Sequence, residues 1–149
     1  MNLSPEPERS QAQPTRLLHT MLRVTDLNQS VSFYCHQLGM TLHRVEDYPD
    51  GRFSLAFLGY GDERTHTLLE LTHNWDEASY VQGTGYGHIA LAVTALDLIC
   101  ERLVESNIKL VRAPGPMTFS SPHRREKERI AFIEDPDGYR IELVELGDL

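Results

Sequence analysis

The chain has 149 residues and a net charge of −8, and 40% of its residues are hydrophobic. This length suits one compact domain, or two small fused modules that share a sheet. The acidic balance argues against non-specific binding of nucleic acids or anionic membrane surfaces. No apolar run reaches the length of about 18–20 residues that a membrane span needs. The chain has only two cysteines, Cys35 and Cys100, so we expect a reduced cytoplasmic protein without a disulfide.

Residues 1–15 are polar and contain three prolines. This composition predicts a disordered leader, and the segment lacks the apolar core of a secretory signal. We therefore expect the folded domain to cover residues 16–146.

The first half of this domain begins with an apolar, β-prone pattern that predicts a strand over Leu17–Val24. Asp26 is a suitable N-cap for a helix over Leu27–Leu38, which Gly39 is expected to end. Turn signals then separate three further predicted strands, over Thr41–Asp47, Phe53–Gly59 and Thr67–His73.

The second half follows a connector over residues 74–87 and repeats this order. A strand is predicted over His88–Val93 and a helix over Leu96–Ser106. A long basic loop is expected between Pro114 and Arg129, and Asp135–Gly138 has the composition of a hairpin turn. The remaining predicted strands are Lys109–Arg112, Ile130–Glu134 and Tyr139–Glu145.

The two halves share sequence as well as order. The stretch His19–Leu27 matches His88–Leu96 in its His, Leu, Val, Thr and Leu positions, and Leu68–Leu71 matches Arg140–Leu143. We therefore predict an α+β fold made of two tandem βαβββ modules with curved sheets. The predicted modules are residues 16–76 and 86–146.

Each module opens with a His and closes with a Glu inside an apolar strand. A Glu in such a position is unusual unless it is paired or bound to a metal. A structural pairing of His with Glu in the core is disfavoured, because buried pairs without a metal rarely stabilise a fold. The repeat therefore predicts a metal site with nitrogen and oxygen donors, and its four candidate ligands are His19, Glu70, His88 and Glu142.

Strand alternation predicts what surrounds these ligands. Alternate residues share a face, so Arg23 should lie on the same face as His19, and Asn74 on the same face as Glu70. We expect Arg23 and Asn74 near the rim of the site. The other histidines are expected on the surface or in loops; they are His36, His43, His66, His73 and His123.

These residues resemble glyoxalase I, the lactoylglutathione lyase family of the vicinal-oxygen-chelate superfamily, over about residues 16–146. The stretches that carry the resemblance are Arg16–Val24, Phe33–Tyr34 with Leu38–Met40, Glu70–Trp75, Tyr86–Ala90, Ala131–Phe132, Glu134–Tyr139 and Ile141–Leu143.

The resemblance implies a homodimer whose metal sites lie at the subunit interface, with one His/Glu pair from each chain. It implies isomerisation of the hemithioacetal of glutathione and methylglyoxal to S-D-lactoylglutathione, by proton transfer through an enediolate. Glu142 would be the principal base, with Glu70 as the second catalytic carboxylate. Arg23 and Asn74 match positions that hold glutathione.

The donor types restrict the choice of metal ion only in part. Two imidazoles and two carboxylates suit Ni²⁺ or Co²⁺ and do not exclude Zn²⁺. By resemblance, His19 in place of Gln and the short connector between Glu70 and His88 favour nickel or cobalt. The basic residue of the 118–128 loop that would contact glutathione is left open among Arg124, Arg125 and Lys127. Thr84 stands where some zinc-dependent relatives carry Arg.

Other functions on the same fold stay open as alternatives. One is a different metalloenzyme, such as a dioxygenase, an epimerase or a thiol transferase. A second is a metal-free protein that sequesters a small molecule, although such a protein has no need of four metal-binding side chains.

Overall fold

The computed structural model describes residues 4–5 and 8–147, and its strands form two separate four-stranded sheets. The first sheet has the order β1-β4-β3-β2 and consists of β1 (His19–Arg23), β2 (Thr41–Tyr48), β3 (Phe53–Gly59) and β4 (Leu68–Asn74). The second has the order β5-β8-β7-β6 and consists of β5 (Ile89–Val93), β6 (Leu110–Pro116), β7 (Arg129–Glu134) and β8 (Arg140–Glu145).

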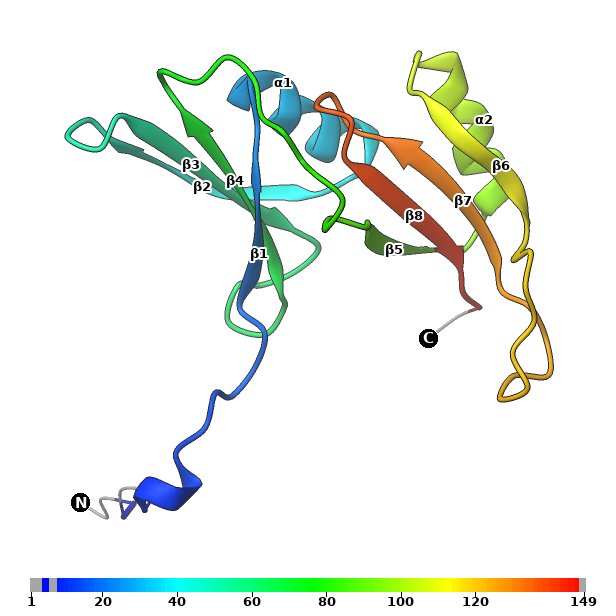
Figure 1. The fold of residues 1–149 in the computed structure, drawn as a ribbon, viewed down its shortest axis with the longest axis horizontal. Helices are drawn as coiled ribbons and strands as arrows, with labels where there is room; N and C mark the ends of the chain where they lie inside the picture. The colour runs from blue at the N-terminus through cyan, green and yellow to red at the C-terminus, as the bar shows by residue number, and fades with distance from the viewer. Residues whose placement is uncertain (1–3, 6–7, 148–149) are drawn as a thin grey trace.

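Each half repeats the same topology. A helix follows the first strand of each half, α1 (Leu27–Ser32) after β1 and α2 (Leu96–Glu105) after β5. The first strand then pairs in parallel with the last strand of its half, and the remaining pairs are antiparallel. This is the predicted α+β fold with two βαβββ repeats (Figure 1).

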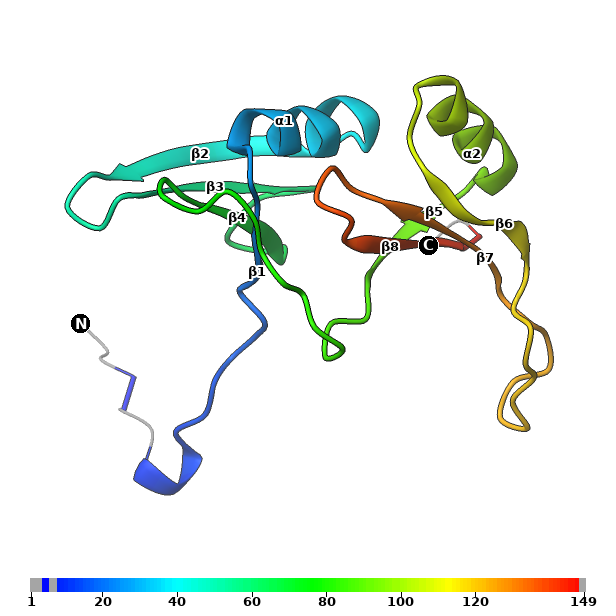
Figure 2. The same ribbon diagram turned by 45° about the horizontal axis from the view of Figure 1, so that its top comes forward.

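The helices lie on one side of the two sheets (Figure 2). Strand residues that face them are buried, for example Leu22 and Val24 near the end of β1 and Leu69 and Leu71 in β4. The same buried cluster includes Leu103 of α2, so one continuous core joins the two halves. The opposite faces of the sheets are left for the polar residues of the candidate site.

The first helix differs from the prediction of one helix over Leu27–Leu38. It starts as expected, because the Asp26 carboxylate accepts a hydrogen bond from the backbone N–H of Gln29 at 3.0 Å. The α-helix ends at Ser32, however, and a wider π-helical turn covers Phe33–Gln37. This turn buries the side chains of both Phe33 and Tyr34.

The chain then leaves this turn at Gly39, which has a φ of 74°. A left-handed residue after a helix is best supplied by glycine. The predicted end at Gly39 is therefore confirmed, although the form of the last helical turn was wrong.

Two predicted strands also need correction. The strand predicted from Leu17 starts at His19, and Leu17 and Leu18 are exposed. The strand predicted over Lys109–Arg112 runs as β6 to Pro116, through two irregularities in its pairing with β7. The other predicted strands and α2 agree with the structure to within one residue at each end.

The described part of the predicted leader forms an exposed arm with a short 3-10 turn over Arg9–Gln11. The arm points away from the sheets (Figure 1). For residues 1–3 and 6–7 the prediction of disorder lies outside the described residues. Within the described part of the chain, no helix is both long and apolar enough to cross a membrane.

Candidate metal centre

The first candidate pair lies on the open face of the first sheet. His19 begins β1, and Met21, two residues on, stands opposite Glu70 of the parallel strand β4. This register brings Nε2 of His19 to 2.7 Å from Oε2 of Glu70. The side chains are 34% and 12% exposed, so both donors are reachable from solvent.

The second pair repeats this geometry. His88 stands just before β5, and Ala90, two residues on, is opposite Glu142 of β8. Nε2 of His88 lies 3.5 Å from Oε2 of Glu142, and the side chains are 41% and 16% exposed. The repeat in sequence is therefore a repeat in three dimensions.

An aromatic ring orients the imidazole in each half. Phe57 of β3 is opposite Glu70, and its ring meets that of His19 edge to face at 5.5 Å between centroids. Phe132 of β7 is opposite Glu142, and its ring meets that of His88 in the same way at 5.2 Å. Edge-to-face packing fixes the plane of each imidazole, so each Nε2 points toward its Glu.

The sequence analysis did not assign these two phenylalanines to the site, although a signal was present. Ala56–Phe57 and Ala131–Phe132 are a third duplicated stretch, each with apolar residues on both sides. In the first half, Arg44 also lies over the ring of Phe57, with Cζ 3.9 Å from the ring centroid.

Arg44 belongs to a short polar network on β2. Its guanidinium donates to Glu46 at 2.9 Å and also contacts Glu63. The Tyr48 hydroxyl donates to the other carboxylate oxygen of Glu46 at 2.7 Å. The Tyr48 hydrogen bond and the Arg44 guanidinium hold the pKa of Glu46 below its usual range.

The two pairs do not meet within one chain. Among residues 4–5 and 8–147, no group of three or more His, Cys, Asp or Glu side chains is close enough to hold a metal ion. The four candidate ligands are therefore brought together two by two, as two half-sites with one nitrogen and one oxygen donor each.

The donor chemistry of each half-site suits a borderline divalent metal. Imidazole nitrogen and carboxylate oxygen are common ligands of Ni²⁺, Co²⁺ and Zn²⁺. Two protein donors are fewer than the three or four that such ions take from protein sites. One half-site alone would therefore be incomplete as a metal site.

Arg23 and Asn74 lie where strand alternation predicts. Arg23 is exposed at the end of β1, opposite Thr72, and Asn74 is half-buried at the end of β4. The backbone N–H of Asn74 donates to the Tyr80 hydroxyl at 3.3 Å. Arg23 and Tyr80 help line a hollow of about 270 Å³.

The other histidines include one correction. His73 was expected on the surface or in a loop. It lies near the end of the strand predicted over Thr67–His73, but it is half-buried there, with Nδ1 3.1 Å from the carbonyl oxygen of Val24. It is on the opposite face of the strand from Glu70, as strand alternation predicts.

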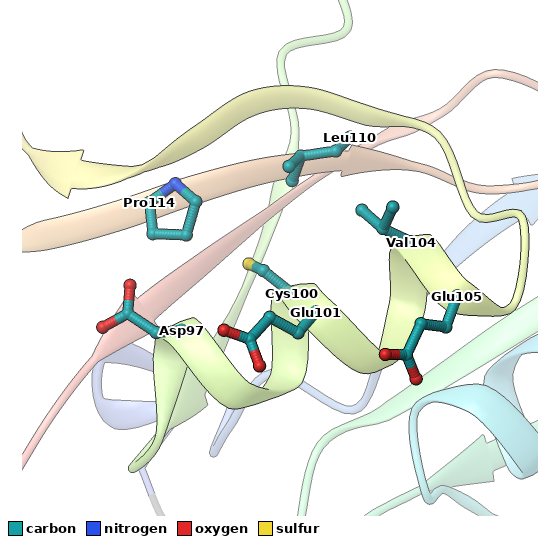
Figure 3. A pocket seen from close by; sticks show the side chains of 7 residues that line it. All are labelled: Asp97, Cys100, Glu101, Val104, Glu105, Leu110 and Pro114. Atoms are coloured by element: carbon teal, nitrogen blue, oxygen red, sulfur yellow. The ribbon is translucent and has the colours of Figure 1, made fainter.

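Two of the basic residues in the 118–128 loop are bonded within the loop itself. Arg124 forms an ion pair with Glu128, and the Lys127 ammonium donates to the carbonyl of Thr118 at 3.2 Å. A separate hollow of about 440 Å³ lies between α2 and β6 (Figure 3). None of the predicted site residues lines it, and Asp97 at its edge is bound to Arg129 at 3.0 Å.

Comparisons with known proteins agree with this architecture. Residues 16–143 match the family model described as the glyoxalase/bleomycin resistance protein/dioxygenase superfamily. A probable lactoylglutathione lyase of Synechocystis is 50% identical over 129 residues, which cover 87% of this chain and 94% of that protein. A lactoylglutathione lyase of Neisseria meningitidis is 52% identical over 130 residues, covering 87% of this chain and 90% of that protein.

Solved structures give the same result. Glyoxalase I from maize superposes with a TM-score of 0.80 at 38% identity, over 89% of this chain and 45% of the maize chain. A trypanothione-dependent glyoxalase I of Leishmania major superposes with a TM-score of 0.74 at 37% identity, over 89% of this chain and 87% of that chain. The chain therefore belongs to the glyoxalase/bleomycin resistance protein/dioxygenase superfamily and, within it, to the lactoylglutathione lyases of the glyoxalase I family.

Proposed function

We propose that this protein is a lactoylglutathione lyase, which isomerises the hemithioacetal of glutathione and methylglyoxal to S-D-lactoylglutathione. The observation that carries the proposal is the duplicated His/Glu pair, at the same register and on the same sheet face in each half. About half of the sequence is identical to proteins named for this activity, over most of their length. The activity is one of methylglyoxal detoxification.

The proposed metal ligands are His19, Glu70, His88 and Glu142, and Ni²⁺ or Co²⁺ is favoured over Zn²⁺. A divalent ion held by these residues would act as a Lewis acid toward negative charge on the substrate oxygens. His19 with Glu70, and His88 with Glu142, each offer one nitrogen and one oxygen to it.

The proposed assembly is a homodimer with its sites at the interface. Each chain offers two half-sites, and the pair that completes either one would come from the other chain. The length of the maize glyoxalase I chain supports this arrangement. The present chain spans 45% of the maize chain, which is therefore long enough for two copies of the present fold. The units proposed within the present chain are residues 16–76 and 86–146.

The proposed proton carrier is Glu142. The reaction moves a proton between two adjacent carbons, so one carboxylate can take it from the first and return it to the second. Oε2 of Glu142 is 3.5 Å from its histidine, against 2.7 Å for Glu70. Glu142 is thus the less tightly held of the two, and Glu70 is the proposed second catalytic carboxylate.

Arg23 and Asn74 are the proposed contacts for glutathione. The planar guanidinium of Arg23 presents two parallel donors that match a carboxylate. The side-chain amide of Asn74 can both donate and accept. A second basic contact would come from Arg124, Arg125 or Lys127 of the 118–128 loop.

The first test measures the rise in thioester absorbance with methylglyoxal and glutathione. Protein stripped with a chelator is re-supplied with Ni²⁺, Co²⁺ or Zn²⁺ in turn. We expect activity with Ni²⁺ and Co²⁺ and little with Zn²⁺. Parallel assays with trypanothione address the thiol, because one similar protein is trypanothione-dependent. Protein that binds metal but forms no thioester with either thiol would overturn the proposed activity.

The interface site has a separate test by complementation. His19→Ala and His88→Ala each remove a ligand from both sites of a homodimer, so each variant alone should be inactive. Mixed dimers regain one intact site, so unfolding and refolding an equal mixture should recover about a quarter of the unmodified activity. The His123→Ala variant, changed in the basic loop, controls for the refolding step. No recovery from a mixture that does form dimers would place both pairs of one site in a single chain.

A further inference from the structure

The turn between β7 and β8 of the second half reaches into the first half. One carboxylate oxygen of Asp137 accepts from the Thr25 backbone N–H at 3.1 Å and from the Thr25 hydroxyl at 2.7 Å. The other oxygen accepts from the Ser30 hydroxyl at 3.4 Å. Two residues on, the Tyr139 hydroxyl donates to the backbone carbonyl of Arg23 at 2.8 Å. The turn therefore bonds to the chain on both sides of Val24, where β1 ends.

The turn has a fixed shape of its own. Asp135 is buried, with 6% of its surface exposed. One of its carboxylate oxygens accepts from the backbone N–H groups of Asp137 and Tyr139, at 2.9 and 2.8 Å. The other accepts from the Tyr34 hydroxyl of the first half at 2.7 Å. Tyr139 and Asp137 thus act from a rigid base that is itself tied to the first half.

The end of β1 needs such support because β1 is an edge strand with a neighbour, β4, on one side only. The N–H of Val24 donates to Thr72 on that side at 2.9 Å. The carbonyl of Arg23 belongs to the same planar peptide unit and points the opposite way, toward the free edge of the sheet. There it meets the Tyr139 hydroxyl and not another strand.

We infer that Tyr139 and Asp137 are positioning residues for Arg23: they hold the backbone at the end of β1 so that the guanidinium stays in place for the anionic end of the substrate. This inference rests on the proposed function, in which Arg23 binds a carboxylate of glutathione. Arg23 and Tyr139 line the same hollow, of about 270 Å³, so the bond lies beside the space that the side chain faces.

The second half provides a contrast. Ala92 stands in β5 where Arg23 stands in β1, four residues after the histidine of the pair. Within the described residues, no side chain bonds to the backbone carbonyl of Ala92. The bond across the two halves is thus made at the strand end that carries a substrate-binding side chain.

The test uses Tyr139→Phe, which removes the hydroxyl and keeps the ring. In the metal-loaded dimer, we expect KM for the hemithioacetal to rise about three- to tenfold, as for the loss of one hydrogen bond, with kcat changed less than about twofold. Asp137→Ala should act in the same direction. Tyr60→Phe is the matched control, because its hydroxyl also donates to a backbone carbonyl, that of Leu38 at 2.6 Å, within the first half. KM of this control should not change.

Coupling to Arg23 separates positioning from general destabilisation. In an Arg23→Ala background, Tyr139→Phe should raise KM no further, because the group to be positioned is gone. An equal rise of KM in both backgrounds, or a loss of kcat at constant KM, would overturn the inference. An unmodified metal-loaded protein that forms no thioester would instead refute the proposed function, and with it the basis for this inference.

Discussion

The four predicted metal ligands form two pairs that differ in how tightly the carboxylate is held, and this difference makes a prediction about Glu142. We expect Glu142→Gln to lower kcat by about 10²- to 10⁴-fold, the usual effect of removing a general base. The amide oxygen can still face a metal ion, so most of the metal content should remain. Steady-state kinetics and metal analysis of the same sample test this.

The matched control for this change is Glu134→Gln. Glu134 lies on the neighbouring strand β7, paired with Lys109 at 3.3 Å. Its replacement makes the same chemical change without touching the pair, so kcat should stay near the unmodified value. An unchanged kcat in Glu142→Gln itself would contradict the role of Glu142 as base.

Arg23 makes a different kind of prediction, because it is expected to bind substrate and transition state alike. Arg23→Ala should raise KM for the hemithioacetal about tenfold or more, the usual weight of a charge-assisted hydrogen bond, with a smaller change in kcat. Arg23→Lys should recover only part of the loss, because an ammonium lacks the planar fork of the guanidinium. A variant with reduced kcat and unchanged KM would show that the side chain acts on the chemical step.

At the scale of residues, the sequence was informative where a feature was duplicated. His19 and His88 could be matched because each precedes the same Leu, Val and Thr positions. Glu70 and Glu142 could be matched because each lies at the same position of a closing strand. The distances within the pairs could not be predicted. They depend on the inter-strand register, which places each Glu two residues beyond its His along the neighbouring strand.

At the scale of elements, Arg112 explains why β6 extends beyond the predicted strand. Its guanidinium donates to the carbonyls of Gly115, Ile130 and Pro116, at 3.1, 2.9 and 2.5 Å. These bonds serve carbonyls in the irregular part of the β6–β7 pair, where the ladder is interrupted. Charged side chains supply such bonds well.

Arg112→Ala should therefore lower the free energy of unfolding by about 1.5–3 kcal/mol, the range for hydrogen bonds to charged groups. Urea unfolding followed by circular dichroism measures this. Arg125→Ala, at an exposed position of the neighbouring loop, is the control and should change stability by less than about 0.5 kcal/mol. Equal midpoints for both variants would show that the β6 irregularity does not depend on the guanidinium.

Periodicity predicted the central parts of the elements and failed at irregular ends. The irregular part of β6 is stabilised by the Arg112 side chain, which donates to the carbonyl of Ile130 on the neighbouring strand. A strand pattern in the sequence gives no signal for such a bond, so β6 was predicted too short. The π-helical turn was missed for a similar reason. The Tyr34 hydroxyl donates to the buried carboxylate of Asp135, 101 residues away, and a local helical pattern gives no signal for such a tertiary partner.

At the scale of the whole molecule, duplication predicted two similar halves but not how they join. The bond from Tyr34 to Asp135 spans 101 residues and that from Tyr139 to Arg23 spans 116. Asp135–Gly138 could be predicted as a turn from its composition. Its second role, as the segment that contacts the first half, leaves no signal in the local sequence. This contact between the halves brings the buried phenols of Tyr34 and Tyr139 close to the buried carboxylate of Asp135. The stability of the protein should therefore depend on pH.

The protein should lose stability in alkali through these phenols. Burial, and then the negative charge of Asp135, raises the pKa of Tyr86 to about 12 and raises the pKa of Tyr34 further. Burial likewise raises the pKa of Tyr139. Unfolded tyrosines ionise near pH 10, so between about pH 10 and 12 the folded state binds more protons than the unfolded state. The free energy of unfolding must then fall as pH rises through this window.

Urea midpoints at pH 9, 10 and 11 measure this fall, and phenolate absorbance reports ionisation in the same samples. Tyr86→Phe should flatten the pH dependence, because it removes one raised group while keeping the ring that packs against Tyr139 at 5.1 Å between centroids. All six tyrosines ionising together near pH 10 in the folded protein, with constant midpoints, would contradict the burial of this contact between the halves. A fall that the Tyr86 variant reduces would instead locate part of the alkaline sensitivity at the contact between the two halves, the same contact that holds the end of β1.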